Sequence, residues 1–98
     1  MVQRRVYAVD ITVNGLRLSQ VIIDPHYELK LSTSITDELI LRLVHLLDGN
    51  DFSPEADDEA YEYFVTENMR LDGKLYRLIW LTEKGKFYLG VVNAYRRR

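Results

Sequence analysis

The sequence contains no cysteine, which excludes a disulfide framework, a thiolate metal site and a cysteine nucleophile. Its two histidines, His26 and His45, lie far apart, so we expect no metal. No apolar run approaches the roughly 20 residues of a membrane span, and the N-terminal residues lack the apolar core of a secretory signal. We therefore expect a cytoplasmic protein without a membrane segment.

Motifs with an established chemistry are also missing. There is no glycine-rich phosphate loop, no nucleophile elbow and no zinc-protease helix, so we expect no cofactor. Glycine (5) and proline (2) are scarce and 47% of the residues are hydrophobic, which is typical of a globular chain. A length of 98 residues predicts a single domain, 1–98.

Charge is distributed unevenly, although the net charge is only −2. Residues 43–69 hold eight acids and no base, whereas residues 70–98 hold eight bases and two acids. Such asymmetry can steer charged partners, but an acidic loop folded beside the basic segment would cancel its field within about 8 Å at physiological salt.

The first half of the chain predicts a β-hairpin followed by a helix. Apolar residues alternate along Val6–Val13, Asn14-Gly15 is a strong hairpin-turn signal, and Leu16–Ile23 returns as a second strand. Ser34–Asp37 resembles a capping box, so we expect one helix that begins there and ends at Gly49. Most of its circumference is apolar, so it should pack on a sheet.

The second half predicts a three-stranded meander over Ala60–Asn68, Leu75–Leu81 and Phe87–Tyr95, with short turns at Asp72-Gly73 and Lys84-Gly85. The middle segment is apolar on both faces, which predicts a central strand covered on both sides. The expected fold is therefore α+β, with the order ββαβββ. Its sheet would be mainly antiparallel, with about five strands, and the one helix would pack on one face. A site would lie on the other face or at its C-terminal edge.

A cluster of titratable residues precedes the predicted helix. His26, whose reference pKa is about 6.5, is suited to act as an acid or a base. Lys30 follows it and is suited to hold a phosphate. The simpler interpretation is a solvated loop, and we favour it.

A second cluster lies on the last two predicted strands. Arg77 would line one sheet face together with Asn93, Tyr95 and Arg96 of the last strand and with Arg70 and Lys74 at the preceding turn. Such a face suits RNA, because cations bind phosphates and rings stack on bases. Arg97 is a further candidate for RNA or anion binding. In the alternative interpretation Arg77 pairs with an acid of the neighbouring strand, such as Glu62, and the terminal arginines are solvated. A pI of 5.6 favours this alternative.

The run Lys74–Trp80 followed by Phe87–Arg97 resembles the closing strands of the RelE/ParE-like toxin superfamily. The resemblance implies a small sheet packed on helix and an RNA-cleaving or target-binding toxin of a toxin–antitoxin pair. It also implies that Arg77 stabilises a phosphate or a transition state, and that Tyr95 or Arg96 serves chemistry or stacking. A ribonuclease of this kind needs a proton acceptor, for which His26 and Tyr95 are the candidates.

Two classes of function remain. The first is a non-catalytic protein-interaction module that forms homodimers through a free strand edge or through its complementary acidic and basic segments. The second is a RelE/ParE-like RNA-binding protein or ribonuclease that uses Arg77, Tyr95 and Arg96, with His26 as a further catalytic candidate. The first needs no unusual residue, so we place it ahead.

Overall fold

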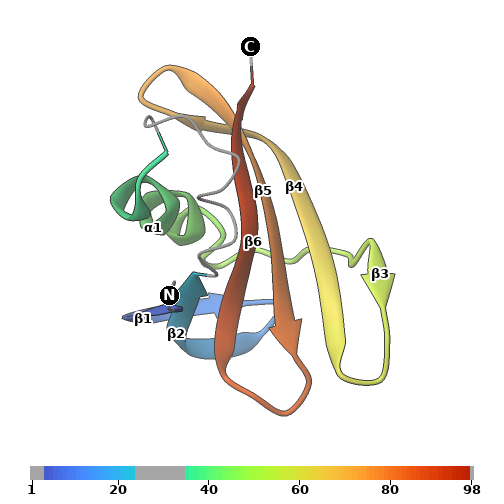
Figure 1. Cartoon of the computed structure of the whole chain (residues 1–98). Helices are drawn as coiled ribbons and strands as arrows, with labels where there is room; N and C mark the ends of the chain where they lie inside the picture. The colour runs from blue at the N-terminus through green and yellow to red at the C-terminus, as the bar shows by residue number, and fades with distance from the viewer. Residues whose placement is uncertain (1–3, 24–34, 98) are drawn as a thin grey trace.

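The computed structural model describes residues 4–23 and 35–97, which form one sheet and one helix (Figure 1). The elements in chain order are β1 (Arg5–Val13), β2 (Leu16–Ile23), α1 (Asp37–His45), β3 (Ala56–Asp57), β4 (Tyr61–Leu71), β5 (Lys74–Glu83) and β6 (Tyr88–Arg97). The strands lie side by side in the order β1-β2-β6-β5-β4-β3. The predicted α+β class is confirmed.

The sheet differs from the prediction in two respects. It has six strands rather than about five, because the two-residue β3 pairs with β4. It is also mixed, because β2 runs parallel to β6 while the other four pairings of the described strands are antiparallel. Neither feature has a local signal, since β3 lies in an acidic stretch without periodicity and the β2–β6 pairing joins distant segments.

Two tight turns follow the sequence signals directly. Asn14 and Gly15 have φ angles of 54° and 74°, as a type I′ turn between β1 and β2 requires. Asp72 and Gly73, with φ angles of 52° and 76°, connect β4 to β5 in the same way. These turns fix the register of both hairpins.

Helix α1 is shorter than predicted. Its N-cap is Thr36, whose Oγ1 accepts the backbone N–H of Leu39 at 3.2 Å. It ends at His45 rather than at Gly49, and residues 46–49 form a turn in which Gly49 has a φ of 81°. The glycine therefore marks the end of the turn, not of the helix.

The first turn of α1 is attached to β1 by a charged contact. The Asp37 carboxylate accepts two hydrogen bonds from the Arg5 guanidinium, at 2.5 and 2.9 Å, and one from the Tyr7 hydroxyl. A carboxylate in this position also stabilises the positive end of the helix dipole. The contact sets where α1 begins relative to the N-terminal hairpin.

The core lies between α1 and one face of the sheet. Leu43 and Val44 of α1 are fully buried, as are Phe64 of β4 and Trp80 of β5. The two rings are stacked, with centroids 4.0 Å apart, and the Trp80 indole N–H donates to Thr66 Oγ1 at 2.9 Å. This face of the sheet is therefore closed by apolar packing with its buried polar atom satisfied.

Replacing a buried and an exposed leucine at the C-terminal part of α1 tests this arrangement. Leu43→Ala should lower the free energy of unfolding by about 2–5 kcal/mol, because it leaves a cavity between helix and sheet. Leu46→Ala, at a side chain that is 43% exposed, should cost less than about 1 kcal/mol. Urea unfolding measures both. Equal losses would contradict the placement of α1.

Candidate functional site

The sheet face turned away from α1, termed the open face, is not covered by a helix of the described chain (Figure 1). One row of residues crosses it through β1, β2, β6, β5 and β4: Val6, Ile22, Gly90, Leu81 and Tyr63. Val6 is 53% exposed, and Ile22, Leu81 and Tyr63 are half-buried. Strand β5 was predicted to be covered on both sides, but only its α1 side is fully buried.

One end of the open face is basic, and we call it the arginine end. Arg70, Leu75 and Arg97 lie opposite one another across β4, β5 and β6, and Arg77 lies opposite Tyr95 in the next row. The Arg77 guanidinium carbon is 5.9 Å from the centre of the Tyr95 ring, within the range of a cation–π contact. This end therefore combines three cations with an aromatic ring.

Arg77 also has an acidic neighbour. Its Nε is 3.2 Å from Glu67 Oε2, yet this buried nitrogen makes no hydrogen bond of good geometry in the described structure. The acid is Glu67 of β4 and not Glu62, which pairs with Thr82 nearer the other end of the strand. The contact is thus an electrostatic one that leaves a donor without a directed partner.

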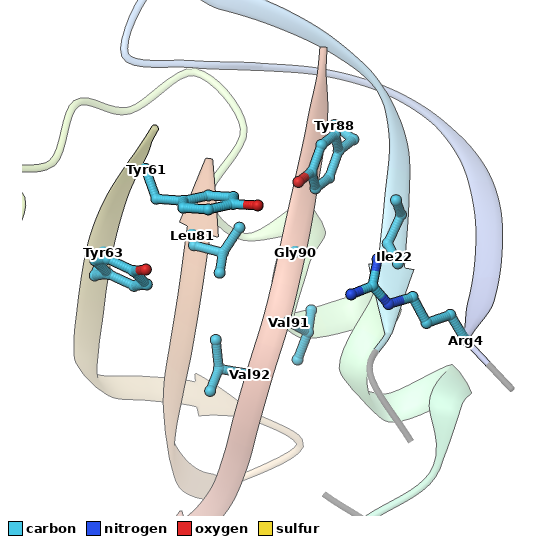
Figure 2. Close-up of a pocket in the computed structure, with 9 residues that line it drawn as sticks. All are labelled: Arg4, Ile22, Tyr61, Tyr63, Leu81, Tyr88, Gly90, Val91 and Val92. Atoms are coloured by element: carbon cyan, nitrogen blue, oxygen red, sulfur yellow. The ribbon is translucent and has the colours of Figure 1, made fainter. Parts of the chain in front are cut away.

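The opposite end of the open face holds three tyrosines around a hollow, and we call it the tyrosine end. The hollow has a volume of about 260 Å³ and its lining comes from both ends of the chain. Figure 2 shows these residues: Arg4, Ile22, Tyr61, Tyr63, Leu81, Tyr88, Gly90, Val91 and Val92. The rings of Tyr61 and Tyr63 are 6.0 Å apart at an angle of 43°. Apolar surface, aromatic rings and one guanidinium group are therefore gathered in one place.

Two carboxylates bind tyrosines at this end. The Tyr88 hydroxyl donates to Glu83 Oε1 at 2.6 Å, and the Tyr63 hydroxyl reaches Asp58 Oδ2 at 3.5 Å. Burial, followed by the hydrogen bond to Glu83, raises the pKa of Tyr88 well above its usual value. Tyr88 thus keeps its proton and serves as a hydrogen-bond donor, which makes it unsuited to act as a base near neutral pH.

The residues proposed from the sequence fall into three groups. Arg77 and Tyr95 meet on the open face, and Arg70 and Arg97 join them. The prediction that Lys74 and Arg96 share this face was wrong: strand alternation places both on the other side, since Arg96 lies opposite the buried Tyr76. The third group, His26 and Lys30, lies outside the described residues, so the proposed partnership of His26 with Arg77 and Tyr95 remains a prediction.

Sequence reasoning missed the hollow. Tyr61 and Tyr63 are two residues apart on a strand, a spacing that predicts a shared face, but nothing local relates them to Tyr88 or Arg4. The floor residue, Gly90, looks like an ordinary strand glycine. Only the pairing of β6 with both β2 and β5 brings these residues together.

No protein-family model matches this chain, and the searches of curated proteins and of solved structures found no significant match either. Among residues 4–23 and 35–97 no three His, Cys, Asp or Glu side chains gather as potential metal ligands. No helix of the same residues is long and apolar enough to cross a membrane.

The Tyr88 contact predicts a pH dependence of stability. In the unfolded chain this phenol releases its proton near pH 10, whereas the folded chain retains it because its pKa is raised. The free energy of unfolding should therefore fall as the pH rises above about 10, and it should fall less steeply in Tyr88→Phe. Denaturant titrations at about pH 8 and about pH 11 measure both slopes. Identical slopes would contradict the contact.

Proposed function

We propose that this chain is a non-catalytic protein-interaction module that forms a homodimer through its open face. The observation that carries the proposal is the composition of this face, in which tyrosines, arginines and aliphatic side chains form continuous rows across neighbouring strands. None of the residues placed on it above is a lysine. Protein interfaces are enriched in Tyr and Arg and depleted in Lys, whereas a purely solvated face is not.

The area of the face suits such a contact. A strand spacing of about 4.8 Å and a rise of about 3.3 Å per residue give the open face roughly 600 Å² before side-chain relief is added. A standard interface buries about 800 Å² on each partner. Packing of two such faces would also cover the second side of β5, which α1 leaves half-buried.

The partner we infer is a second copy, because arginines outnumber the one acid, Glu67, at the arginine end, whereas two acids accompany one arginine, Arg4, at the tyrosine end. Arg70, Arg77 and Arg97 lie at the arginine end, while Asp58 and Glu83 bind the tyrosines of the other end. A twofold axis that lies between the two faces, parallel to them and perpendicular to the strands, places the arginine end of each copy over the tyrosine end of the other. This arrangement is self-complementary, as a symmetric dimer requires.

The strand edges are less available for pairing with a second copy than the sequence indicated. Strand β3 pairs with the outer edge of β4 at Glu62 and Tyr63. On the other side of the sheet, the Gly49 N–H donates to Thr12 O at 2.7 Å and the Asn14 N–H donates to Asn50 O at 3.1 Å, so a turn occupies one end of β1. We therefore place the contact on the face rather than on an edge.

Charge reversal tests this arrangement. Arg70→Glu/Arg97→Glu should lose dimers because like charges then meet, and Glu83→Lys should lose them for the same reason. An equimolar mixture of the two variants should recover a heterodimer, since each changed end meets a changed end of opposite sign. Analytical ultracentrifugation measures the masses, and circular dichroism verifies folding.

The matched control is Lys74→Glu/Arg96→Glu, which reverses two charges on the other side of the same strands and should dimerise like the wild type. A wild-type chain that stays monomeric at every concentration, variants that do not complement each other, or an equal loss in the control would overturn the proposal.

Single-stranded RNA is the second candidate, favoured by the Arg77–Tyr95 contact with Arg70 and Arg97 on the same face. Binding of labelled single-stranded RNA should then fall as salt rises and be lost in Arg77→Ala. Arg42→Ala, whose guanidinium pairs with Asp72, should leave binding unchanged. Fluorescence anisotropy at two salt concentrations measures this binding. Absence of binding at low salt would overturn the RNA-binding proposal.

A further inference from the structure

A glycine in the lining of the hollow makes room for the side chain of Leu81. Gly90 does not have a positive φ, unlike Gly15, Gly49, Gly73 and Gly85, so its backbone does not require a glycine. A Cβ at this position would lie 2.8 Å from Leu81 Cδ1, and Leu81 would have to move. Gly90 therefore leaves room for the side chain of Leu81. This is a usual role of a glycine in a strand that another group approaches closely.

The walls of the hollow are aromatic and apolar. In Figure 2 Tyr61 and Tyr88 lie on the same side of Gly90, and their hydroxyls point toward each other. Tyr63 and Leu81 lie toward β4 and β5, and Ile22 closes the side of β2. Such walls favour a flat ring that can contact tyrosine faces and aliphatic groups at once.

One cation of the hollow has no acidic partner among residues 4–23 and 35–97. Arg4 lies beside Ile22 in Figure 2 and makes no ion pair with a described residue, whereas Arg5, Arg17 and Arg42 each bind an aspartate. No carboxylate of the described residues lines the hollow, and the nearby Glu83 accepts a hydrogen bond from the Tyr88 hydroxyl. A guanidinium at an aromatic hollow without a carboxylate is suited to an anionic group on a ring.

We propose that this hollow binds a small planar aromatic anion, with its ring among the tyrosines and its carboxylate or phosphate on Arg4. A volume of about 260 Å³ lies just below the range of roughly 300–1,000 Å³ for sites of drug-sized ligands. The ligand is therefore of the size of one single or fused ring system with one anionic group.

Binding to the hollow does not require the homodimer, because every lining residue belongs to one chain. A regulatory consequence does rest on the proposed function. The hollow lies within the open face, so a bound ligand and a second copy would compete for the same residues. By linkage, the ligand would shift the population toward monomers.

Isothermal titration calorimetry of the wild-type chain tests the site with two probes. Indole-3-acetate represents carboxylates and adenosine 5′-monophosphate represents phosphates, and saturable binding of either supports the proposal and identifies the anion. Adenosine and inorganic phosphate, which each lack one half of the chemistry, should bind about tenfold more weakly or not at all. Failure of both probes, or equal binding of adenosine and its monophosphate, would overturn the proposal.

Two variants locate the site. Arg4→Gln should lower the affinity for whichever probe binds about tenfold or more, because it removes a charged hydrogen-bond donor. Gly90→Ala should abolish binding by displacing Leu81 into the hollow. Arg96→Gln removes the same charge from the other face and should bind like the wild type. Unchanged binding in Arg4→Gln contradicts the site even where Gly90→Ala fails to fold.

Sedimentation with and without the probe separates this proposal from the previous one. Dissociation of dimers by the probe supports both. Probe binding to a chain that is monomeric throughout supports the hollow and removes the homodimer, whereas dimers without probe binding remove the hollow alone. Dimers that persist at saturating probe contradict the competition between them.

Discussion

One short helix faces a sheet of six strands, and this mismatch governs the rest of the structure. Nine residues of helix extend about 14 Å, which is enough to cover one side of the central strands. No helix of the described residues covers the other side. Strand β5 nevertheless carries apolar residues at both odd and even positions, so they lie on both of its sides. The buried side contains Tyr76, Leu78 and Trp80, and the half-buried side contains Leu75, Ile79 and Leu81. The open face is therefore built of side chains that a folded protein normally packs, and both proposals follow from that surplus of apolar surface.

The sequence predicted what depends on neighbours in the chain. Asn14-Gly15 and Asp72-Gly73 form the expected turns because their backbone preferences are local, and Arg77 meets Tyr95 because a short turn joins their strands. It did not predict the parallel pairing of β2 with β6, which depends on contacts between segments more than sixty residues apart. The predicted end of helix α1 was wrong for a related reason. Residues 46–49 form a turn after the helix, and the Gly49 N–H donates a hydrogen bond to the N-terminal hairpin.

The two ends of the candidate site differ in the same way, since the sequence could predict one of them and not the other. The arginine end lies on strands joined by tight turns, so alternation alone could place Arg70, Arg77 and Arg97 on one face. The hollow requires Arg4, Ile22, Tyr61 and Tyr88, which four different parts of the chain supply. Gly90 shows why such a site is not visible in a sequence. Its importance lies in an absent side chain at the place where β2 and β5 flank β6, and absence has meaning only once the neighbours are known.

The position of β6 has a consequence for how the chain folds. This strand follows every other described strand in sequence, yet it lies between β2 and β5 and, of the described strands, it alone pairs with both the N-terminal hairpin and the β4–β5 hairpin. During synthesis both hairpins emerge first and expose the edges that β6 will occupy. They can unite only after residues 88–97 have left the ribosome, and the slow step should be the insertion of this last strand. Until then each hairpin offers an unpaired edge to other chains, which makes the nascent chain vulnerable to aggregation before β6 has emerged.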